Sequence, residues 1–220
     1  MDTGTLVSLL WEGLLQTLYM TLIGTLISYL IGLPIGVSLV VTGPNGIRPI
    51  GIYNKVMGFI VNVIRSVPFL ILMIALMPYI RKIIGTGIGT SATTAALIVA
   101  AAPFVARLVE QSILEVDAGV IEAAQAMGAS NFQIIRKVLL LEARPSLLNG
   151  AAVATINILG YSAMAGIVGG GGLGDIAIRY GLYRFQPAIM WITIVVLVVL
   201  VQILQEVGIR VASRMDNRIN

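Results

Sequence analysis

The sequence predicts an all-α, polytopic membrane protein with five transmembrane helices. Of its 220 residues, 58% are hydrophobic and only 11% are charged, compared with roughly 45–50% and 25% in soluble domains. A soluble domain of this size cannot bury so many apolar side chains, so the surplus must face lipid. The 24 glycines and 8 prolines agree with this, because both residues are more frequent in membrane helices than in soluble ones.

Stretches without charge locate the five helices, because about 20 apolar residues cross the hydrocarbon core. Glu12 and Arg48 bracket the first stretch, and the fifth contains the most apolar run, which begins at Trp191. The second is interrupted by Arg65, which we expect near the cytoplasmic end of its helix, where a long side chain can reach the interface. The expected spans are about 16–41, 57–80, 88–107, 145–170 and 185–207.

An odd number of spans places the two ends of the chain on opposite sides of the membrane. We expect the segment 1–12 outside the cell and the tail 209–220 in the cytoplasm, in a multi-pass protein of the inner, or cytoplasmic, membrane. The cytoplasmic segments then carry nine basic residues and the outer segments four, as the positive-inside rule requires. The four outer cations keep the inverse orientation open. The nine are Arg48, Lys55, Arg107, Arg136, Lys137, Arg144, Arg210, Arg214 and Arg218, and the four are Arg81, Lys82, Arg179 and Arg184.

Several function classes are excluded by residues that the sequence lacks. It contains no cysteine and no histidine, so thiol and imidazole ligands or nucleophiles are absent, and we expect no metal, no cofactor and no catalytic residue. No Gly-x-x-x-x-Gly-Lys-Ser/Thr phosphate-binding loop occurs, so a separate chain would have to bind ATP. The net charge of +4 is spread through the loops, and we therefore expect a lipid bilayer and no nucleic acid as partner.

Two glycine patterns have competing interpretations. Residues 169–174 match Gly-x-Gly-x-x-Gly, but they follow a membrane helix and not a strand, so we expect a flexible or tightly packed outer turn and no dinucleotide site. Gly32 and Gly36 match the close-packing motif of membrane helices. Pro34 lies between them, so a kink is an equally good interpretation.

The polar segment 108–144 is too long for a simple connection and contains helix signals throughout. Asp117 is a plausible N-cap, and Gly128 sits where a helix C-terminus needs positive φ. Ser130 and Gln133 form the pattern of a capping box that opens a second helix, running to about Leu141. We therefore expect two short helices that meet at a glycine elbow.

The spacing within this segment resembles the EAA loop of ABC importer permeases. Glu122, Ala123 and Ala124 precede Gly128 by the family's interval, and Val138 and Leu140 follow it. The family commonly has proline after the final leucine, whereas this chain has Leu141, which leaves room for the second helix to run further. The resemblance implies that the loop docks into a cleft on an ATP-hydrolysing subunit. The implied coupling residues are Glu122, Ala123, Ala124, Gly128, Val138 and Leu140.

The resemblance extends over most of the chain. Residues 65–69 resemble the Arg-x-x-Pro element of amino-acid permeases, and residues 102–107, 160–164 and 169–174 are similar to methionine-importer permeases. Membership implies the type I ABC importer permease fold over residues 13–208, and import of L- and D-methionine. It also implies three kinds of partner: a second copy of the chain, two ABC ATPase subunits at the cytoplasmic face, and an extracytoplasmic methionine-binding protein.

Polar residues inside apolar spans indicate where a solute could pass. On the fourth span, Asn149, Val153, Asn157, Tyr161 and Met164 share one helix face, and on the second Asn62, Ser66, Phe69 and Met73 do the same. Such residues also commonly bond helix to helix, and that interpretation stays open. For Arg65 we expect a structural ion pair, with Glu110 as one candidate partner, and the path or the ATPase as other roles. The candidate path and gate residues are Asn157, Tyr161, Ser162, Met164, Asn62, Ser66 and Phe69.

Three other functions are compatible with such an architecture. The nearest is an ABC permease for another amino acid or small solute. An ion-coupled secondary transporter is less favoured, because we find no internal repeat and the acidic residues cluster in loops. A membrane scaffold whose loop recruits a soluble partner is the third.

Overall fold

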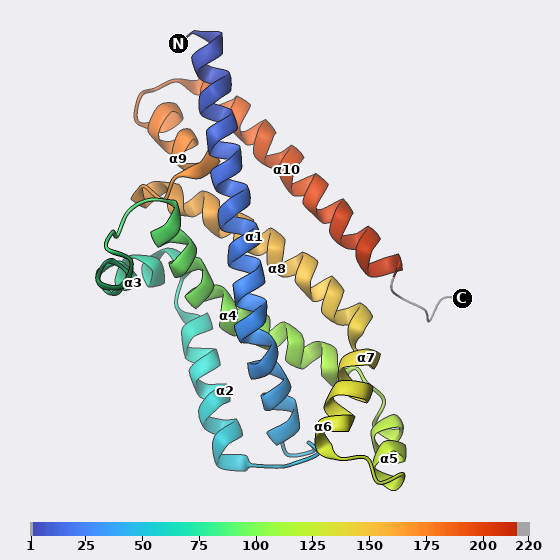
Figure 1. Ribbon diagram of the computed structural model, residues 1–220. Coiled ribbons are helices and arrows are strands. Elements are labelled where there is room, and N and C mark those ends of the chain that lie inside the picture. Colours follow the sequence, from blue (N-terminus) through green and yellow to red (C-terminus); the bar gives the residue numbers. More distant parts are fainter. Residues whose placement is uncertain (1, 215–220) are drawn as a thin grey trace.

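The computed structural model describes residues 2–214 of the chain (Figure 1). Met1 and residues 215–220, which include Arg218 and the end of the expected tail, lie outside the described residues. Residues 2–214 form helices joined by short connections, and no strand occurs among them. The all-α membrane architecture predicted from composition is therefore confirmed. By length and composition, α1, α4, α8 with its continuation, and α10 could each cross a membrane, and a bent pair of helices would make a fifth span.

Helix α1 (Thr3–Thr42) begins well before residue 16, so the expected outer segment 1–12 is largely helical. Glu12 does not end the helix, because a charged side chain leaves the backbone hydrogen bonds intact, and its Oε1 accepts a hydrogen bond from Gln16 Nε2 at 3.1 Å. The early turns have a tertiary role. Gln16 Oε1 accepts from the backbone N–H of Gly172 at 2.7 Å, and Thr17 Oγ1 from that of Leu173 at 2.9 Å. These bonds satisfy the first N–H groups of α9 (Gly172–Ile176).

Helices α1 and α4 (Thr90–Leu114) make the most extensive contact in the chain. Gly32 and Gly36 of α1 are buried there, and neither has room for a Cβ. A Cβ at Gly32 would lie 2.7 Å from Val105 Cγ1, and one at Gly36 would lie 2.7 Å from Val109 Cβ. Helix α1 remains continuous through Pro34. The glycine pair therefore serves close packing within the chain, and the proline does not break the helix.

The expected second span, 57–80, is not one helix. Helix α2 (Gly51–Ser66) and helix α3 (Phe69–Ile84) meet at 105°, so a continuous span was the wrong expectation. Pro68 has no N–H and disfavours helical dihedrals in the residue before it. Val67 accordingly is extended, with φ −79° and ψ 126°, and its N–H bonds the carbonyl of Ile64 at 3.3 Å.

Two of the remaining helices extend beyond the charge-free stretches that predicted them, and one matches its stretch. Helix α4 runs past residue 107 to Leu114, whereas α8 (Arg144–Met164) and the 3₁₀ turn that continues it over Ala165–Val168 agree with the expected span 145–170. Helix α10 (Pro187–Arg214) includes the first residues of the expected tail 209–220. Its last turns carry an ion pair between Glu206 and Arg210, with 2.7 Å between Oε1 and Nε. Oppositely charged residues four positions apart stabilise a helix.

The cores of the bundle lie at different heights along it. One cluster joins α1, α3, α4 and α8 around Met20, Met73, Leu97 and Ile158. A second joins α8, α9 and α10 around Leu173. The third lies at the end that holds α5 (Ala118–Ala126), α6 (Asn131–Ile134) and α7 (Leu140–Glu142), where the connection between α1 and α2 also lies (Figure 1). We call this end of the bundle the loop end.

Candidate coupling loop and translocation face

The first helix of the loop starts where the sequence predicts it. Asp117 is the N-cap of α5, and its Oδ1 accepts a hydrogen bond from the backbone N–H of Gly119 at 2.7 Å. Ala124 is buried in the core of the loop end, whereas Glu122 and Ala123 are exposed. Glu122 makes no ion pair or hydrogen bond within residues 2–214. One face of α5 is therefore fixed to the bundle, and the face with Glu122 is free for a partner.

Gly128 forms the elbow between the two loop helices. Its φ is +78°, a region that residues with a Cβ rarely adopt. Its N–H bonds the carbonyl of Gln125 at 2.9 Å, and the N–H of Ala129 bonds the carbonyl of Ala124 at 3.1 Å. This pair of bonds is the Schellman motif, which ends a helix and reverses the chain. The positive φ inferred from the sequence is present in the structure.

The second loop helix begins with the predicted capping box. Ser130 Oγ accepts from the N–H of Gln133 at 3.4 Å, and Gln133 Oε1 accepts from the N–H of Ser130 at 2.8 Å. The helix passes through a π-helical turn at Ile135–Leu139 and ends with α7 at Glu142. Val138 and Leu140 are half-buried against the core of the loop end. They hold the second helix in place and are only partly available to a partner.

Exposed apolar side chains lie on both loop helices, and none of them was among the site residues predicted from the sequence. Met127 is 82% exposed, Phe132 is 68% exposed and Val120 is 42% exposed. A small polar loop does not need such residues on its surface, and apolar groups exposed together commonly mark an interaction site. The sequence did contain a signal for this site, because Met127 directly precedes Gly128 and Phe132 lies in the first turn after Ser130.

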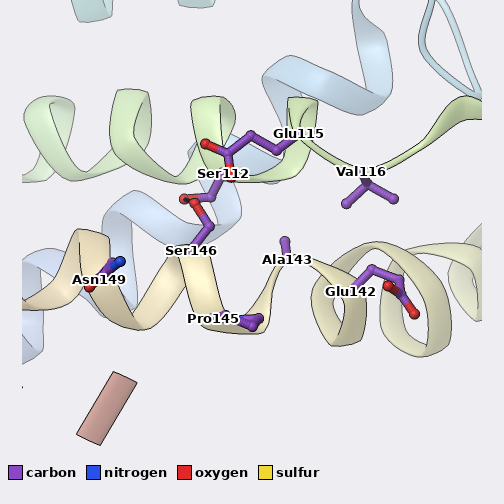
Figure 2. A pocket seen from close by; sticks show the side chains of 8 residues that line it. All are labelled: Ser112, Glu115, Val116, Glu142, Ala143, Pro145, Ser146 and Asn149. Atoms are coloured by element: carbon purple, nitrogen blue, oxygen red, sulfur yellow. Dashed lines mark hydrogen bonds between the residues drawn. The ribbon is translucent and has the colours of Figure 1, made fainter. Parts of the chain in front are cut away.

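A polar recess of about 290 Å³ lies between the end of α4 and the start of α8, next to α7 (Figure 2). Ser112 of α4 and Ser146 of α8 point toward one another in Figure 2, and their hydroxyls are hydrogen-bonded at 3.0 Å. Two carboxylates, of Glu115 and Glu142, also line it. Across residues 2–214, no three His, Cys, Asp or Glu side chains are grouped to hold a metal ion.

The predicted face of α8 is partly open in the single chain. Met164 is 51% exposed at the end of the helix, and Asn157 and Tyr161 are half-buried. The Nδ2 of Asn157 donates to the carbonyl of Val153 at 2.9 Å. Ser162 departs from the expectation, because it is 1% exposed and its hydroxyl bonds the carbonyl of Leu159 at 2.7 Å. The structure therefore separates Ser162 from Met164 and Tyr161.

The second predicted face is split by the break at Pro68. Asn62 and Ser66 stay on α2, where the Ser66 hydroxyl donates to the carbonyl of Asn62 at 2.8 Å. Phe69 and Met73 belong to α3 and are buried, so the four residues do not share one helix face. Phe69 instead stacks on Tyr161 of α8, with ring centroids 4.5 Å apart and an interplanar angle of 11°. The fold thereby joins two of the predicted path residues from different helices.

Arg65 does not form the expected pair with Glu110. Glu110 is paired with Arg107 in the next turn of α4, at 2.5 Å from Oε2 to Nη1. The other guanidinium nitrogen of Arg107 donates to Asn62 Oδ1 at 2.8 Å and thereby ties α4 to α2. Arg65 lies in the last turn of α2, about 21 Å along the helix from Gly51. The expectation of a Glu110 partner was therefore wrong, and the expected position of Arg65 near the membrane interface stays a prediction.

The glycine run 169–174 is a tightly packed turn. Gly172 has φ +80°, and a Cβ there would lie 2.7 Å from Thr17 Oγ1 and 2.8 Å from Met20 Cε. The backbone can approach α1 this closely only because the residue is glycine. Of the two interpretations offered for this run, tight packing is the one that the structure supports.

The comparisons with known proteins agree over nearly the whole chain. Residues 24–210 match the family model described as binding-protein-dependent transport system inner membrane component. The chain is 49% identical over 203 residues to the probable D-methionine transport system permease protein MetI of Vibrio cholerae, covering 92% of this chain and 90% of the relative. It is 44% identical over 209 residues to the methionine import system permease protein MetP of Bacillus subtilis, covering 95% and 94%.

Solved structures show the same similarity. A structure of inward-facing conformations of the MetNI methionine ABC transporter superposes with a TM-score of 0.96 at 43% identity, covering 99% of this chain and 100% of the other. A structure of an amino acid ABC transporter has a TM-score of 0.73 at 22% identity, covering 99% of each chain. The second likeness concerns the fold alone.

Proposed function

Because the chain belongs to the family of binding-protein-dependent transport system inner membrane components, we propose that it is the permease subunit of an ABC importer for methionine. The observation that carries the proposal is that methionine permeases match this chain in sequence over more than nine tenths of its length, and a methionine transporter matches it in fold. The names of these relatives favour methionine over other amino acids. The chain is a multi-pass inner membrane protein and a transport subunit.

A separate subunit supplies the energy in this proposal. The sequence has no phosphate-binding loop of its own, and the loop end presents the exposed Glu122 on α5 together with the exposed apolar side chains of Met127 and Phe132 beside Gly128. An ATPase subunit that binds there would be coupled to α4 and α8, because Ala124 of α5 and Ile134 of α6 belong to the same buried cluster as residues of α4 and α8. The loop end is then cytoplasmic, and the start of α1 faces outward, where an extracytoplasmic methionine-binding protein would dock.

Uptake of labelled methionine into proteoliposomes tests this function. We expect concentrative uptake when the chain is reconstituted with its ATPase subunit, ATP inside and the binding protein outside, and none when ATP is omitted. The chain alone should not concentrate methionine. Concentrative uptake by the chain alone would contradict the proposal, and a complete assembly that transports only another amino acid would correct the substrate.

A second copy of the chain faces the exposed end of α8 in this proposal, with Met164 at the gate between the copies. Met164 is exposed in the single chain, and an unbranched thioether side chain can adapt to a closing interface. Since the chain has no cysteine, Met164→Cys would give it a single thiol. We expect that thiol to react with pore-permeant reagents at a rate that changes with the nucleotide state.

Ser162→Cys is the matched control for the gate, because this neighbouring side chain is buried and should stay protected. Met164→Ala should leave assembly intact and raise the uncoupled leak of methionine, because alanine fills less of the gate. A thiol at position 164 that stays unreactive in every nucleotide state would place the gate elsewhere.

A further inference from the structure

A cavity of about 230 Å³ lies at the break between α2 and α3, and α4 and α8 close it. The stacked rings of Phe69 and Tyr161 form one of its walls. Ala100 and Phe104 of α4 line it as well, and Arg65 is the only charged residue among the described residues of the lining. The volume is below the roughly 300–1,000 Å³ of pockets for drug-sized ligands. A cavity of this size suits a small molecule such as one amino acid.

Arg65 brings an uncompensated charge to this cavity. Among residues 2–214 no side chain or carbonyl pairs with its guanidinium, and the acid expected to do so, Glu110, is occupied by Arg107. Arg65 is exposed in the single chain and lies about 21 Å along α2 from Gly51, on the bent helix pair that could form one membrane span. An ionisable side chain within a membrane span is energetically costly, and such residues characteristically mark a substrate or ion path.

We propose that this cavity is a transient methionine subsite within the membrane, in which Arg65 binds the carboxylate. This inference rests on the proposed function and adds the residue that recognises the substrate. A guanidinium can donate two parallel hydrogen bonds to a carboxylate, and the break at Pro68 places the uncapped N-terminus of α3 beside the same cavity. The thioether then lies against Phe69 and Tyr161, since sulfur makes favourable contacts with aromatic rings.

The same geometry leaves the α-ammonium group of the substrate without a partner, because none of the residues from 2 to 214 that line the cavity is acidic. Two points of attachment, the carboxylate and the side chain, do not distinguish the mirror-image forms of an amino acid. We therefore expect the subsite to accept L- and D-methionine alike. Binding without an ion pair at the ammonium is also weak, as a path requires if the substrate is to leave it.

Photolabelling of the complex between the permease and its ATPase subunit tests the subsite. The probe is a methionine analogue with a diazirine in place of the thioether, and its attachment to peptides containing Phe69 or Tyr161 is measured by mass spectrometry. We expect labelling in the wild type that L-methionine and D-methionine suppress equally, and that methioninamide, which has no carboxylate, does not suppress. Arg65→Gln should lower the labelling at least about tenfold, the ratio expected for loss of a charge-assisted hydrogen bond.

Two further variants keep the test decisive if Arg65→Gln assembles poorly. Arg65→Lys keeps the charge and should retain part of the labelling, whereas Arg48→Gln removes an exposed cation outside the cavity and should retain all of it. Undiminished labelling in an assembled Arg65→Gln complex would overturn the subsite. So would a wild-type complex that transports methionine but shows no label on the lining peptides.

Uptake measured in parallel separates this inference from the proposed function. Absent methionine uptake by the complete wild-type importer, with labelling that still depends on Arg65, would contradict the function and support the carboxylate subsite. Normal methionine uptake together with labelling that does not depend on Arg65 would contradict the subsite and leave the proposed function intact.

Discussion

Replacing Gly128 with valine is expected to abolish most ATP-dependent methionine uptake while the protein still inserts into the membrane in normal amounts. The glycine has φ +78°, and a residue with a Cβ at positive φ costs about 1–2 kcal/mol, with a β-branched residue at the upper end because its side chain crowds the backbone. A change of about 1.4 kcal/mol corresponds to a factor of ten in an equilibrium constant. The elbow between α5 and α6 would have to open or stay strained.

The effect reaches the ATPase subunit through the exposed residues around the elbow. Met127 and Phe132 flank Gly128 on the two loop helices, so a change in the elbow angle displaces them relative to the anchored face of α5. We expect weaker co-purification of the ATPase subunit and a fall in uptake of at least about tenfold. Co-purification and proteoliposome uptake, both normalised to the amount of membrane-embedded permease, are the measurements.

Gly128→Asn is the matched control. Nothing lies within 4 Å of a Cβ at this position, so a side chain meets no neighbour, and asparagine tolerates positive φ better than other residues with a Cβ. It should retain much of the coupling. Glu122→Ala should be mild as well, because it removes an exposed charge without changing the backbone. If Gly128→Val couples like the wild type, the rigid elbow has no part in docking.

Replacing Gly36 with valine is expected to prevent correct packing of the bundle. A Cβ there would lie 2.7 Å from Val109 Cβ, and the carbonyl oxygen of Ala106 lies closer still. A backbone atom cannot move aside as a side chain can, so α1 and α4 would have to separate along their shared contact. Overpacking of a core costs roughly 1–3 kcal/mol and occasionally more. This contact is the most extensive in the chain, so we expect the upper end of that range or beyond.

The measurement is the monodisperse fraction after detergent extraction, together with the temperature of thermal aggregation. Gly36→Val should give little monodisperse protein. Gly4→Val makes the same exchange on α1 at an exposed position where the nearest atom, Asp2 Oδ2, is 3.6 Å from the new Cβ, and it should behave like the wild type. Wild-type aggregation temperature in Gly36→Val would mean that α1 and α4 do not approach this closely.

The local signals in the segment 108–144 were interpreted correctly from the sequence. The N-cap at Asp117, the positive φ of Gly128 and the capping box of Ser130 and Gln133 are all present. Each depends on hydrogen bonds within about five residues or on the conformation of one residue, so the sequence contains the whole interaction. The break at Pro68 depends on local chemistry too, but whether proline kinks a membrane helix or splits it depends on the helices around it.

Partners across the bundle could not be inferred in the same way. Glu110 pairs with Arg107 on its own helix, so Arg65 lines a cavity without that partner. Ser162 faces the interior, while Met164 is exposed. In a soluble helix the apolar face identifies the core. In a membrane helix apolar residues face both lipid and protein, so hydropathy does not indicate which side is buried.

The sequence by itself determined the class of molecule, because composition and charge-free length decide whether a chain can reside in lipid. It also determined the loop helices and their elbow, because short-range hydrogen bonds form them. Only the tertiary structure decided that α1 begins at Thr3 and that Gln16 and Thr17, in its early turns, accept hydrogen bonds from the start of α9. It also decided that Phe69 stacks on Tyr161 in the lining of the cavity that contains Arg65. These contacts join residues far apart in the chain, and they exist only because close packing at positions such as Gly32 and Gly36 sets how the helices lie against one another.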